Sequence, residues 1–394
     1  MRVSPVRLPL PAFAGATVLA VAAPSAVAAP ADPKPAAALT ATATAPGTPG
    51  QVAWTDGRLV RVRDASGARR TVARLRRPID ARDGLTLSRD GRRLAVVAED
   101  GLWTVPVADG GPAVRIGDRL GYYELVRWSA DDRRLLYVGE RSLNLCDAAG
   151  PCRELRDDSA DEFGATWAPD GGAVAYVRRR GSSGGEDDSE PGDLVAVDLA
   201  SDRTTVVERA TGTGDRFAGP LPPTWTRGGL AWSSARYAGE DADAPQRVRV
   251  RLRGADGRTR TLTSSTVTPK SPDILLVGGE APDGAVAGLL FSDGESTDST
   301  AVSHAAVLGA DGVPRPIGPA IRQTRRTRMT LLGRLADGRI AVQSESTRNG
   351  RLWRTALYVV APDATRLGAP AVVGQGPAGR VSAAMAFPND ASAF

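Results

Sequence analysis

A short motif recurs along the chain from about residue 80 to the C-terminus, and it constrains the fold more than any other feature. It consists of an apolar strand, a tight Asp-Gly type of turn and a second apolar strand. A repeat of this length indicates stacked copies of one supersecondary unit, each covering the apolar face of its neighbour. The clearest copies are Leu87–Gly91 followed by Leu94–Val97 and Trp167–Gly171 followed by Val174–Val177, and weaker copies begin at Trp128, Trp225, Glu280 and Arg334.

Each unit is predicted to contain four short strands, which we name A to D in chain order. Apolar runs separated by Asp-Gly and Gly-Gly turns are typical of consecutive β-hairpins. The second unit has expected strands at 85–87, 94–98, 102–107 and 113–116, and the third at 125–128, 135–138, 143–145 and 153–155. Later units are expected to begin near Phe163, Pro222, Ile274 and Arg328.

The first and last units of the repeat region are incomplete, and each contains the strands that the other lacks. Residues 51–75 supply B, C and D strands without an A strand, whereas Val381–Phe387 is typical of an A strand with nothing after it. Pairing these fragments would close a ring and remove the open sheet edges. The predicted fold is an all-β, seven-bladed β-propeller of four-stranded antiparallel blades, closed by the segment around Ala384–Phe387 joining the N-terminal blade. Six or eight blades are the alternatives, because the units after Arg216 are degenerate.

The N-terminal region is typical of an export signal followed by a tether. Arg2 and Arg7 precede a short apolar stretch and an Ala-Val-Ala motif, which predicts a signal peptide over 1–28 with cleavage after Ala28. Residues 29–50 are almost entirely Ala, Pro, Thr and Gly, and such a composition predicts a disordered linker. The propeller is expected to occupy 51–394, and the protein is expected to be secreted.

The charge pattern argues against nucleic acid as a partner. The chain has a formal net charge of +5, but its arginines are scattered among carboxylates and lack interleaved aromatic residues. No later segment is apolar and long enough to span a bilayer, so no integral membrane segment is expected. We expect a monomer without a cofactor.

Cys146 and Cys152 are the two cysteines, and they bracket the turn sequence Asp-Ala-Ala-Gly-Pro. Because exported proteins favour oxidised thiols, an intramolecular disulfide across a C–D turn is predicted. Two thiols without nearby histidines would leave zinc half-coordinated, and the spacing is not C-x-x-C, so neither a metal site nor a redox motif is expected. The bond should stabilise the fold by roughly 2 kcal/mol, since the loop is so small.

Two features of the sequence resemble the repeats of the TolB family of WD-repeat-like propellers. They are the turns related to Trp-Ser-Pro-Asp-Gly and the Leu-Trp-Thr-Val strand at 102–105. They are similar in particular to exported actinobacterial TolB-like proteins, and the resemblance covers about residues 51–390. It implies a periplasmic or extracellular binding scaffold. Related propellers also precede peptidase domains, but the repeats here reach the last residues, so no such domain is expected. The separate N-terminal domain of TolB is not recognisable, which argues against a TolB–Pal type of role.

The connections between strands divide between the two ends of the predicted ring. The A–B and C–D turns are tight, whereas several B–C and D–A connections are long: 181–192, 211–223, 236–246, 292–300 and 319–327. Long connections on a rigid frame commonly carry binding residues, although solvated insertions are the alternative. Aromatic and arginine residues are enriched at binding hot spots, so the predicted ligand-binding residues are Tyr122, Tyr123, Arg216, Phe217, Tyr237, Arg322, Arg325 and Arg326.

Several motifs match catalytic patterns without their structural context. Gly181–Gly185 fits G-x-S-x-G, but a nucleophile elbow needs a following helix and a histidine, and His304, the only histidine, lies in a predicted strand. Residues 374–379 fit G-x-G-x-x-G but are predicted to form a loop before the closing strand. The acidic connections lack the spacing of a calcium-binding loop. We therefore predict no catalytic and no metal-ligating residues.

Carboxylate chemistry in the central channel is the enzymatic alternative. Glu124 and Glu162 lie at or near A strands, and a glycosidase or lyase needs only such acids or a Tyr/Arg set. Trp128, Trp167 and Trp225 occupy equivalent A-strand ends and are interpreted as packing between blades, with an aromatic sugar platform as the alternative.

The function that the sequence favours is a secreted, non-enzymatic TolB-like scaffold that binds a protein, peptide or cell-envelope ligand. A carbohydrate-active enzyme that uses channel carboxylates is the second possibility. A structural protein of the envelope is the third.

Overall fold

The structure is a computed structural model, and it describes 51–56, 58–64, 66–76, 85–98, 100–108, 110–117, 125–138, 143–156, 162–179, 192–213, 216–236, 246–267, 274–281, 285–291, 302–322, 324, 327–334, 339–348, 351–375, 381–383 and 387–388. The regular elements of these residues are strands, numbered β1 to β31. The predicted signal peptide (1–28) and linker (29–50) lie outside them. Within these ranges, no helix has the length and apolar character needed to cross a membrane.

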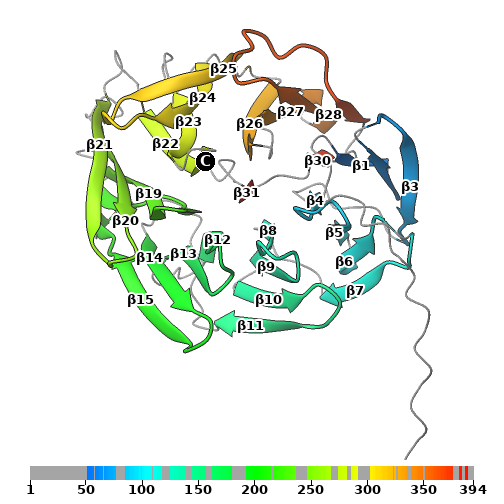
Figure 1. The fold of residues 1–394 in the computed structure, drawn as a ribbon, viewed down its shortest axis with the longest axis horizontal. Coiled ribbons are helices and arrows are strands. Elements are labelled where there is room, and N and C mark those ends of the chain that lie inside the picture. The colour runs from blue at the N-terminus through cyan, green and yellow to red at the C-terminus, as the bar shows by residue number, and fades with distance from the viewer. Residues whose placement is uncertain are drawn as a thin grey trace, which may run out of the picture. The chain divides into compact units, whose positions relative to one another are not determined.

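The strands form seven antiparallel sheets arranged in a ring, which confirms the prediction of a seven-bladed β-propeller (Figure 1). Blade 1 contains β1 (Val52–Asp56), β2 (Leu59–Arg63), β3 (Arg69–Arg74) and β30 (Val381–Ala383). Blade 2 contains β4 (Leu85–Leu87), β5 (Arg93–Ala98), β6 (Gly101–Pro106) and β7 (Val114–Gly117). Blade 3 contains β8 (Leu125–Trp128), β9 (Arg134–Val138), β10 (Leu143–Asp147) and β11 (Cys152–Arg156). Blade 4 contains β12 (Glu162–Trp167), β13 (Ala173–Arg179), β14 (Gly192–Asp198) and β15 (Arg203–Glu208).

The remaining three blades follow in chain order. Blade 5 contains β16 (Thr211–Thr213), β17 (Arg216–Pro220), β18 (Thr224–Thr226), β19 (Gly229–Arg236), β20 (Gln246–Arg253) and β21 (Thr259–Val267). Blade 6 contains β22 (Ile274–Glu280), β23 (Val286–Phe291), β24 (Val302–Leu308) and β25 (Pro314–Arg322). Blade 7 contains β26 (Thr327–Arg334), β27 (Ile340–Arg348), β28 (Arg351–Val360), β29 (Val372–Gln375) and β31 (Phe387–Pro388).

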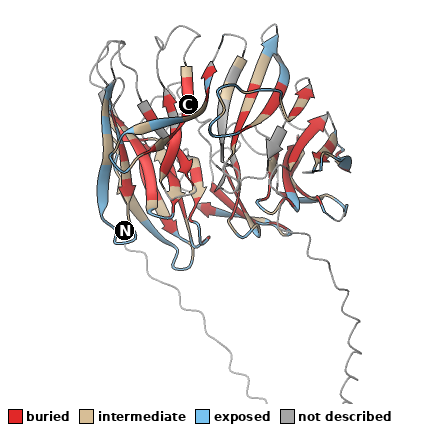
Figure 2. Ribbon diagram, turned by 45° about the horizontal axis from the view of Figure 1, so that its top comes forward, coloured by how far each residue is buried: buried red, intermediate tan, exposed pale blue. Residues whose placement is uncertain are grey.

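The hydrophobic core is divided among the junctions between blades. Seven clusters of buried side chains occur among the described residues, and each cluster joins two neighbouring blades. In β5, Leu94 and Val96 pack with blade 1, whereas Ala95 and Val97 pack with blade 3. Successive strand residues point to opposite faces, so a strand covered on both sides needs an uninterrupted apolar run. Outer strands such as β3 and β15 are much more exposed (Figure 2).

The recurring turn has a hydrogen-bonding plan that explains its sequence. In blade 2, the Asp90 carboxylate accepts the N–H of Arg92 at 2.8 Å and the hydroxyl of Ser88 at 2.7 Å. Ser88 Oγ accepts the N–H of Arg93 at 2.9 Å. Gly91 has a φ of 68°, a left-handed conformation that glycine adopts without steric cost. Asp131 and Asp170 accept a backbone N–H in the turns of blades 3 and 4 in the same way, so the aspartate recurs because its side chain satisfies the backbone of the turn.

The ring is closed by the C-terminal part of the chain, as predicted. β30 pairs antiparallel with β1, with Ala383 opposite Val52 and Val381 opposite Trp54. Residues 384–386, at the predicted centre of this strand, lie outside the described residues. Phe387 instead lies opposite Arg334, so β31 joins β26 of blade 7. The two segments thus contact both blades at the closing junction.

Blade 5 departs most from the four-strand plan. The predicted connection 211–223 contains the hairpin β16–β17, and β17 pairs with the second half of β19, with Ala218 opposite Arg236. β18 pairs with the first half of β19, and the Leu221 N–H donates to the Ser233 carbonyl between the two strands at 2.8 Å. The connection predicted at 319–327 is also shorter than expected, because β25 continues to Arg322.

Candidate binding face

The end of the ring that carries the A–B turns is held together by hydrogen bonds between blades. The two carboxylate oxygens of Asp132 in blade 3 accept the N–H groups of Arg89 at 2.8 Å and Asp90 at 2.9 Å, in the turn of blade 2. Arg134 donates to the Gly171 carbonyl in the turn of blade 4 at 2.7 Å. These polar groups are engaged in joining blades, so this end of the ring has a structural role.

Asp132 takes the place that glycine has in the other turns, with a φ of 56°. Burial raises the pKa of its carboxyl group above the usual 3.8, because the loss of water penalises the charge more than the two N–H donors favour it. A second carboxylate, Glu280, accepts the Arg227 N–H at 2.8 Å and ties blade 5 to blade 6 in the same way. The Glu280 side chain is fully buried.

The predicted packing role of the A-strand tryptophans is confirmed. Trp128 Nε1 donates to the Thr86 carbonyl of the preceding blade at 3.1 Å. Trp167 Nε1 of blade 4 donates to the Arg127 carbonyl of blade 3 at 3.1 Å. Trp225 packs against the cluster between blades 4 and 5. Trp128 and Trp167 are buried by these contacts, which leaves their rings unavailable as a sugar platform.

The predicted disulfide is also present. Cys146 and Cys152 are bonded to each other and lie opposite one another across the C–D hairpin of β10 and β11, with 3.9 Å between their Cα atoms. Cys146 is fully buried in the cluster that joins blades 2 and 3. A Cβ placed on Gly117 of blade 2 would lie 3.0 Å from Cys152 Sγ, so the neighbouring blade packs directly against the bond.

The predicted ligand-binding residues fall in or beside the B–C and D–A connections, and most of them lie outside the described residues. The backbone places Arg216 and Phe217 at the start of β17 and Arg322 at the end of β25, and their side chains are not described. The predicted set that lies outside the described residues is Tyr122, Tyr123, Tyr237, Arg325 and Arg326. Whether these groups form one site stays a prediction.

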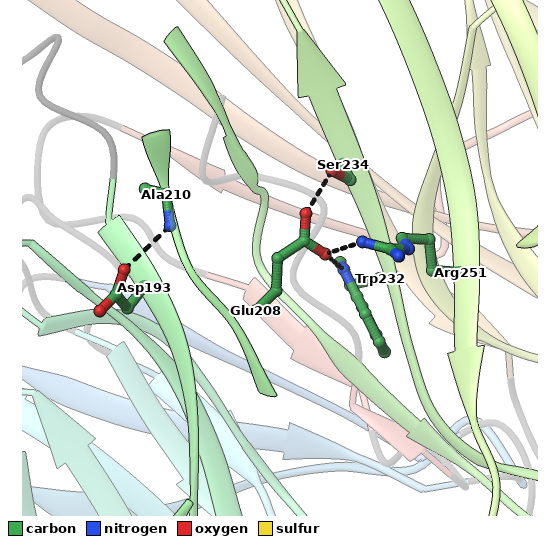
Figure 3. A network of polar contacts seen from close by, with 6 residues as sticks. All are labelled: Asp193, Glu208, Ala210, Trp232, Ser234 and Arg251. Carbon is green, nitrogen blue, oxygen red and sulfur yellow. Dashed lines mark hydrogen bonds and ion pairs between the residues drawn. The ribbon is translucent and has the colours of Figure 1, made fainter. Parts of the chain in front are cut away.

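A polar cluster that the sequence did not predict lies between blades 4 and 5 (Figure 3). Glu208, the last residue of β15, accepts hydrogen bonds from Trp232 Nε1 at 2.5 Å and Ser234 Oγ at 2.6 Å, both on β19. Arg251 on β20 donates to Glu208 at 2.8 Å and forms an ion pair with it. The side chains of Arg251 and Glu208 are 29% and 13% exposed, so the pair is partly screened from water.

The crossing from blade 4 to blade 5 positions this cluster. Asp193 is buried and accepts the N–H of Ala210 at 2.9 Å, which holds the chain just after Glu208 (Figure 3). A Cβ on Gly164 would lie 2.5 Å from Pro222, so the connection into β18 runs tightly against β12. No local pattern predicts this arrangement, because Glu208 and Arg251 are 43 residues apart.

An exposed aromatic side chain stands at the opposite end of the ring from the A–B turns. Trp353 on β28 is 53% exposed, and the guanidinium carbon of Arg348 lies 5.3 Å from the centre of its ring. Both residues are close to the hairpin between β27 and β28, a B–C connection. Sequence analysis missed them because this connection is short, although Arg-Leu-Trp-Arg at 351–354 combines the residue types expected at a binding hot spot.

The residues named in the catalytic alternatives lie partly outside the described part of the chain. His304 lies on β24, as predicted, and its Nδ1 is buried without a hydrogen-bond partner among the described residues. Glu162 begins β12, but its side chain is not described, and Glu124 and Gly181–Gly185 lie outside the described residues. Gly374 belongs to β29 rather than to a loop. Within the described part of the chain, no three His, Cys, Asp or Glu side chains are grouped as metal ligands would be.

The ring of seven antiparallel sheets defines the class of the protein as a seven-bladed β-propeller. No protein-family model matches the chain, and no curated protein matches it in sequence.

Solved structures that are similar to this chain include two TolB proteins. TolB from Acinetobacter baumannii has 14% identity and a TM-score of 0.40, over 70% of this chain and 64% of that one. The chain thus spans just under two thirds of that protein. A putative TolB from Agrobacterium tumefaciens has 14% identity and a TM-score of 0.39, over 68% and 89% of the two chains. An oligogalacturonate lyase from Vibrio parahaemolyticus has 10% identity and a TM-score of 0.36, over 79% and 96%.

Proposed function

We propose that the protein is an exported, non-enzymatic TolB-like scaffold that binds a protein, peptide or cell-envelope ligand. The proposed binding face is the end of the ring that carries the B–C and D–A connections. The observation that carries this proposal is the contrast between the two ends. The A–B end engages Asp132, Arg134 and Glu280 in bonds between blades, whereas the other end presents Trp353 with Arg348 against its ring.

An exposed tryptophan beside an arginine suits the recognition of a partner. Trp buries a large area at little entropic cost, and Arg supplies several donors in a fixed geometry, so both are enriched at binding hot spots. The predicted residues Arg216, Phe217 and Arg322 begin or end strands at the same end of their blades as the β27–β28 hairpin. A ligand bound there could contact residues from several blades.

The experiment is affinity capture from the native culture supernatant and envelope fraction with the immobilised protein. Trp353→Ala combined with Arg348→Ala should abolish or strongly reduce capture of the specific ligand. The matched control is Val313→Ala, because Val313 is also 53% exposed but lies in a C–D turn at the other end of the ring. Loss of capture in the Val313 variant, with normal capture by the double variant, would show that the binding site lies at the A–B end of the ring and would contradict the proposal.

Export is tested separately by N-terminal sequencing of the protein recovered from the culture medium. The proposed cleavage after Ala28 predicts a mature chain that begins at Ala29. An intact N-terminus on protein found only inside the cell would contradict export.

A further inference from the structure

The outer half of blade 5 carries a ladder of arginines. β20 has arginine at every second position, alternating with the buried residues Val248, Val250 and Leu252. Because successive strand residues point to opposite faces, the arginines share one face of the sheet, the face that packs on blade 4 through Trp232. The ladder consists of Arg247, Arg249, Arg251 and Arg253.

Three arginines of this ladder, Arg247, Arg249 and Arg253, have no carboxylate partner among the described residues. Arg251 is paired with Glu208, but Arg247 and Arg249 are exposed and form no ion pair there. Arg236 on β19 is also exposed and lies directly opposite Arg247. Like charges directly opposite one another destabilise a sheet, so the stability of the fold does not explain this arrangement.

The strand beside the ladder is an open edge. β21 is the last strand of its sheet, and its outer edge pairs with no described strand. The turn of blade 6 lies against the start of this edge, where a Cβ on Gly312 would lie 2.8 Å from the Leu262 carbonyl oxygen and 4.0 Å from Thr263 Cβ. Along Thr263–Val267 this edge has neither charge nor proline. In contrast, the outer strand β25 contains three prolines and the outer strand β3 three arginines, and both residue types hinder the addition of another strand.

The side chain of Arg247 already reaches over this edge strand. Arg247 lies opposite Thr266, and its Nε donates to Ser264 Oγ on β21 at 3.1 Å. Its guanidinium group is thus directed towards the next strand position, about 4.8 Å beyond β21. An added strand would place alternate side chains about 6.8 Å apart, the same period as the arginines.

We propose that the edge Thr263–Val267, flanked by Arg247 and Arg249, binds an extended peptide segment with acidic residues at alternate positions. The peptide would pair its backbone with β21 and direct its carboxylates at the two guanidinium groups. A peptide is favoured over another polyanion because the edge offers backbone donors and acceptors as well as positive charge. This site is separate from the face around Trp353 and does not depend on the function proposed for that face.

The test measures binding of a fluorescein-labelled peptide of four Thr-Glu repeats by fluorescence polarisation at about 0.15 M salt, where exposed charges are strongly screened beyond about 8 Å. Arg247→Gln with Arg249→Gln should weaken binding by about tenfold, since each lost pair is a charge-assisted hydrogen bond. The matched control, Arg258→Gln with Arg260→Gln, removes two exposed arginines from the neighbouring turn and from the other face of β21. This control and Trp353→Ala should bind normally.

Two further probes separate strand addition from simple charge attraction. The same peptide with alternate backbone N–H groups methylated should bind at least tenfold more weakly, because a methylated amide cannot donate to β21. If the methylated peptide binds as well as the unmodified one and inorganic polyphosphate displaces both peptides, the site recognises polyanions and the proposal is wrong.

The connection 237–245 contains Glu240, Asp241 and Asp243. Binding seen only after these are changed to Gln and Asn would show that the chain's own carboxylates fill the face, which also overturns the proposal.

Discussion

The guanidinium carbon of Arg134 lies 5.0 Å from the centre of the Trp167 ring, across the junction between blades 3 and 4. The same guanidinium donates to the Gly171 carbonyl, and the Trp167 indole donates to the Arg127 carbonyl. A cation–π contact and two hydrogen bonds therefore join two blades that share no strand pairing. Contacts of this kind set the orientation of one blade on the next, because apolar packing alone is not directional.

Replacing Trp167 by Phe should lower the free energy of unfolding by about 1 kcal/mol, because a smaller aromatic ring stays in place while the bond to the Arg127 carbonyl is lost. The measurement is urea denaturation monitored by circular dichroism. Trp353→Phe is the matched control and should leave stability unchanged, since Trp353 is 53% exposed. Equal effects of the two substitutions would contradict a specific role for the indole bond.

Replacing Glu208 by Gln should destabilise the protein by about 2 kcal/mol, because Arg251 loses its carboxylate and Trp232 and Ser234 lose a charged acceptor. The double variant with Arg251→Gln should cost less than the sum of the two single variants, since the residues interact directly. Chemical denaturation of all four proteins measures this coupling. Strict additivity would show that the ion pair contributes nothing.

Replacing Cys146 and Cys152 by Ser should lower the free energy of unfolding by roughly 2 kcal/mol, the amount expected for a loop this short. Mass spectrometry of the non-reduced wild-type protein should find a mass lower by two hydrogens than that of the reduced form. Two free thiols on folded, exported protein would contradict the disulfide.

Truncation should reveal how much the closure contributes. Deleting 381–394 removes both β30 and β31, exposes the inner edges of β1 and β26, and should cause aggregation and a lower melting temperature. Deleting 389–394 is the control, because it keeps both pairings. Similar melting temperatures for the two truncated proteins would show that the closing strand is dispensable.

The pH dependence of stability should reflect the raised pKa of Asp132. Between 3.8 and the higher folded-state pKa, the folded chain binds more protons at Asp132 than the unfolded chain does. The contribution of this carboxyl group to stability therefore falls as pH rises through that range. The difference in unfolding free energy between wild type and Asp132→Asn should thus grow as the pH is lowered from 7 to about 4. A difference that shrinks on acidification would mean that the two N–H donors outweigh burial.

The repeat of the chain was sufficient to predict the blades and the way they close. Strands such as Leu85–Leu87 and Leu125–Trp128 begin and end where the sequence predicts, because apolar alternation and Ser-x-Asp turns act over a few residues. The disulfide was predictable for the same reason, since Cys146 and Cys152 flank one turn. The six-strand arrangement of blade 5 was not, because β17 and β18 share one partner strand.

What the sequence by itself determined is the seven-bladed ring, its closure and the packing of the A-strand tryptophans, all of which follow from local periodicity repeated along the chain. Only the tertiary structure decided which side chains meet between blades. Glu208 and Arg251, or Asp132 and Arg89, are about 40 residues apart, and they meet because two sheets stack with a particular register. The alternation of arginines along β20 is a property of the sequence, but their position beside an open edge strand, β21, depends on register and on which strand is left at the edge.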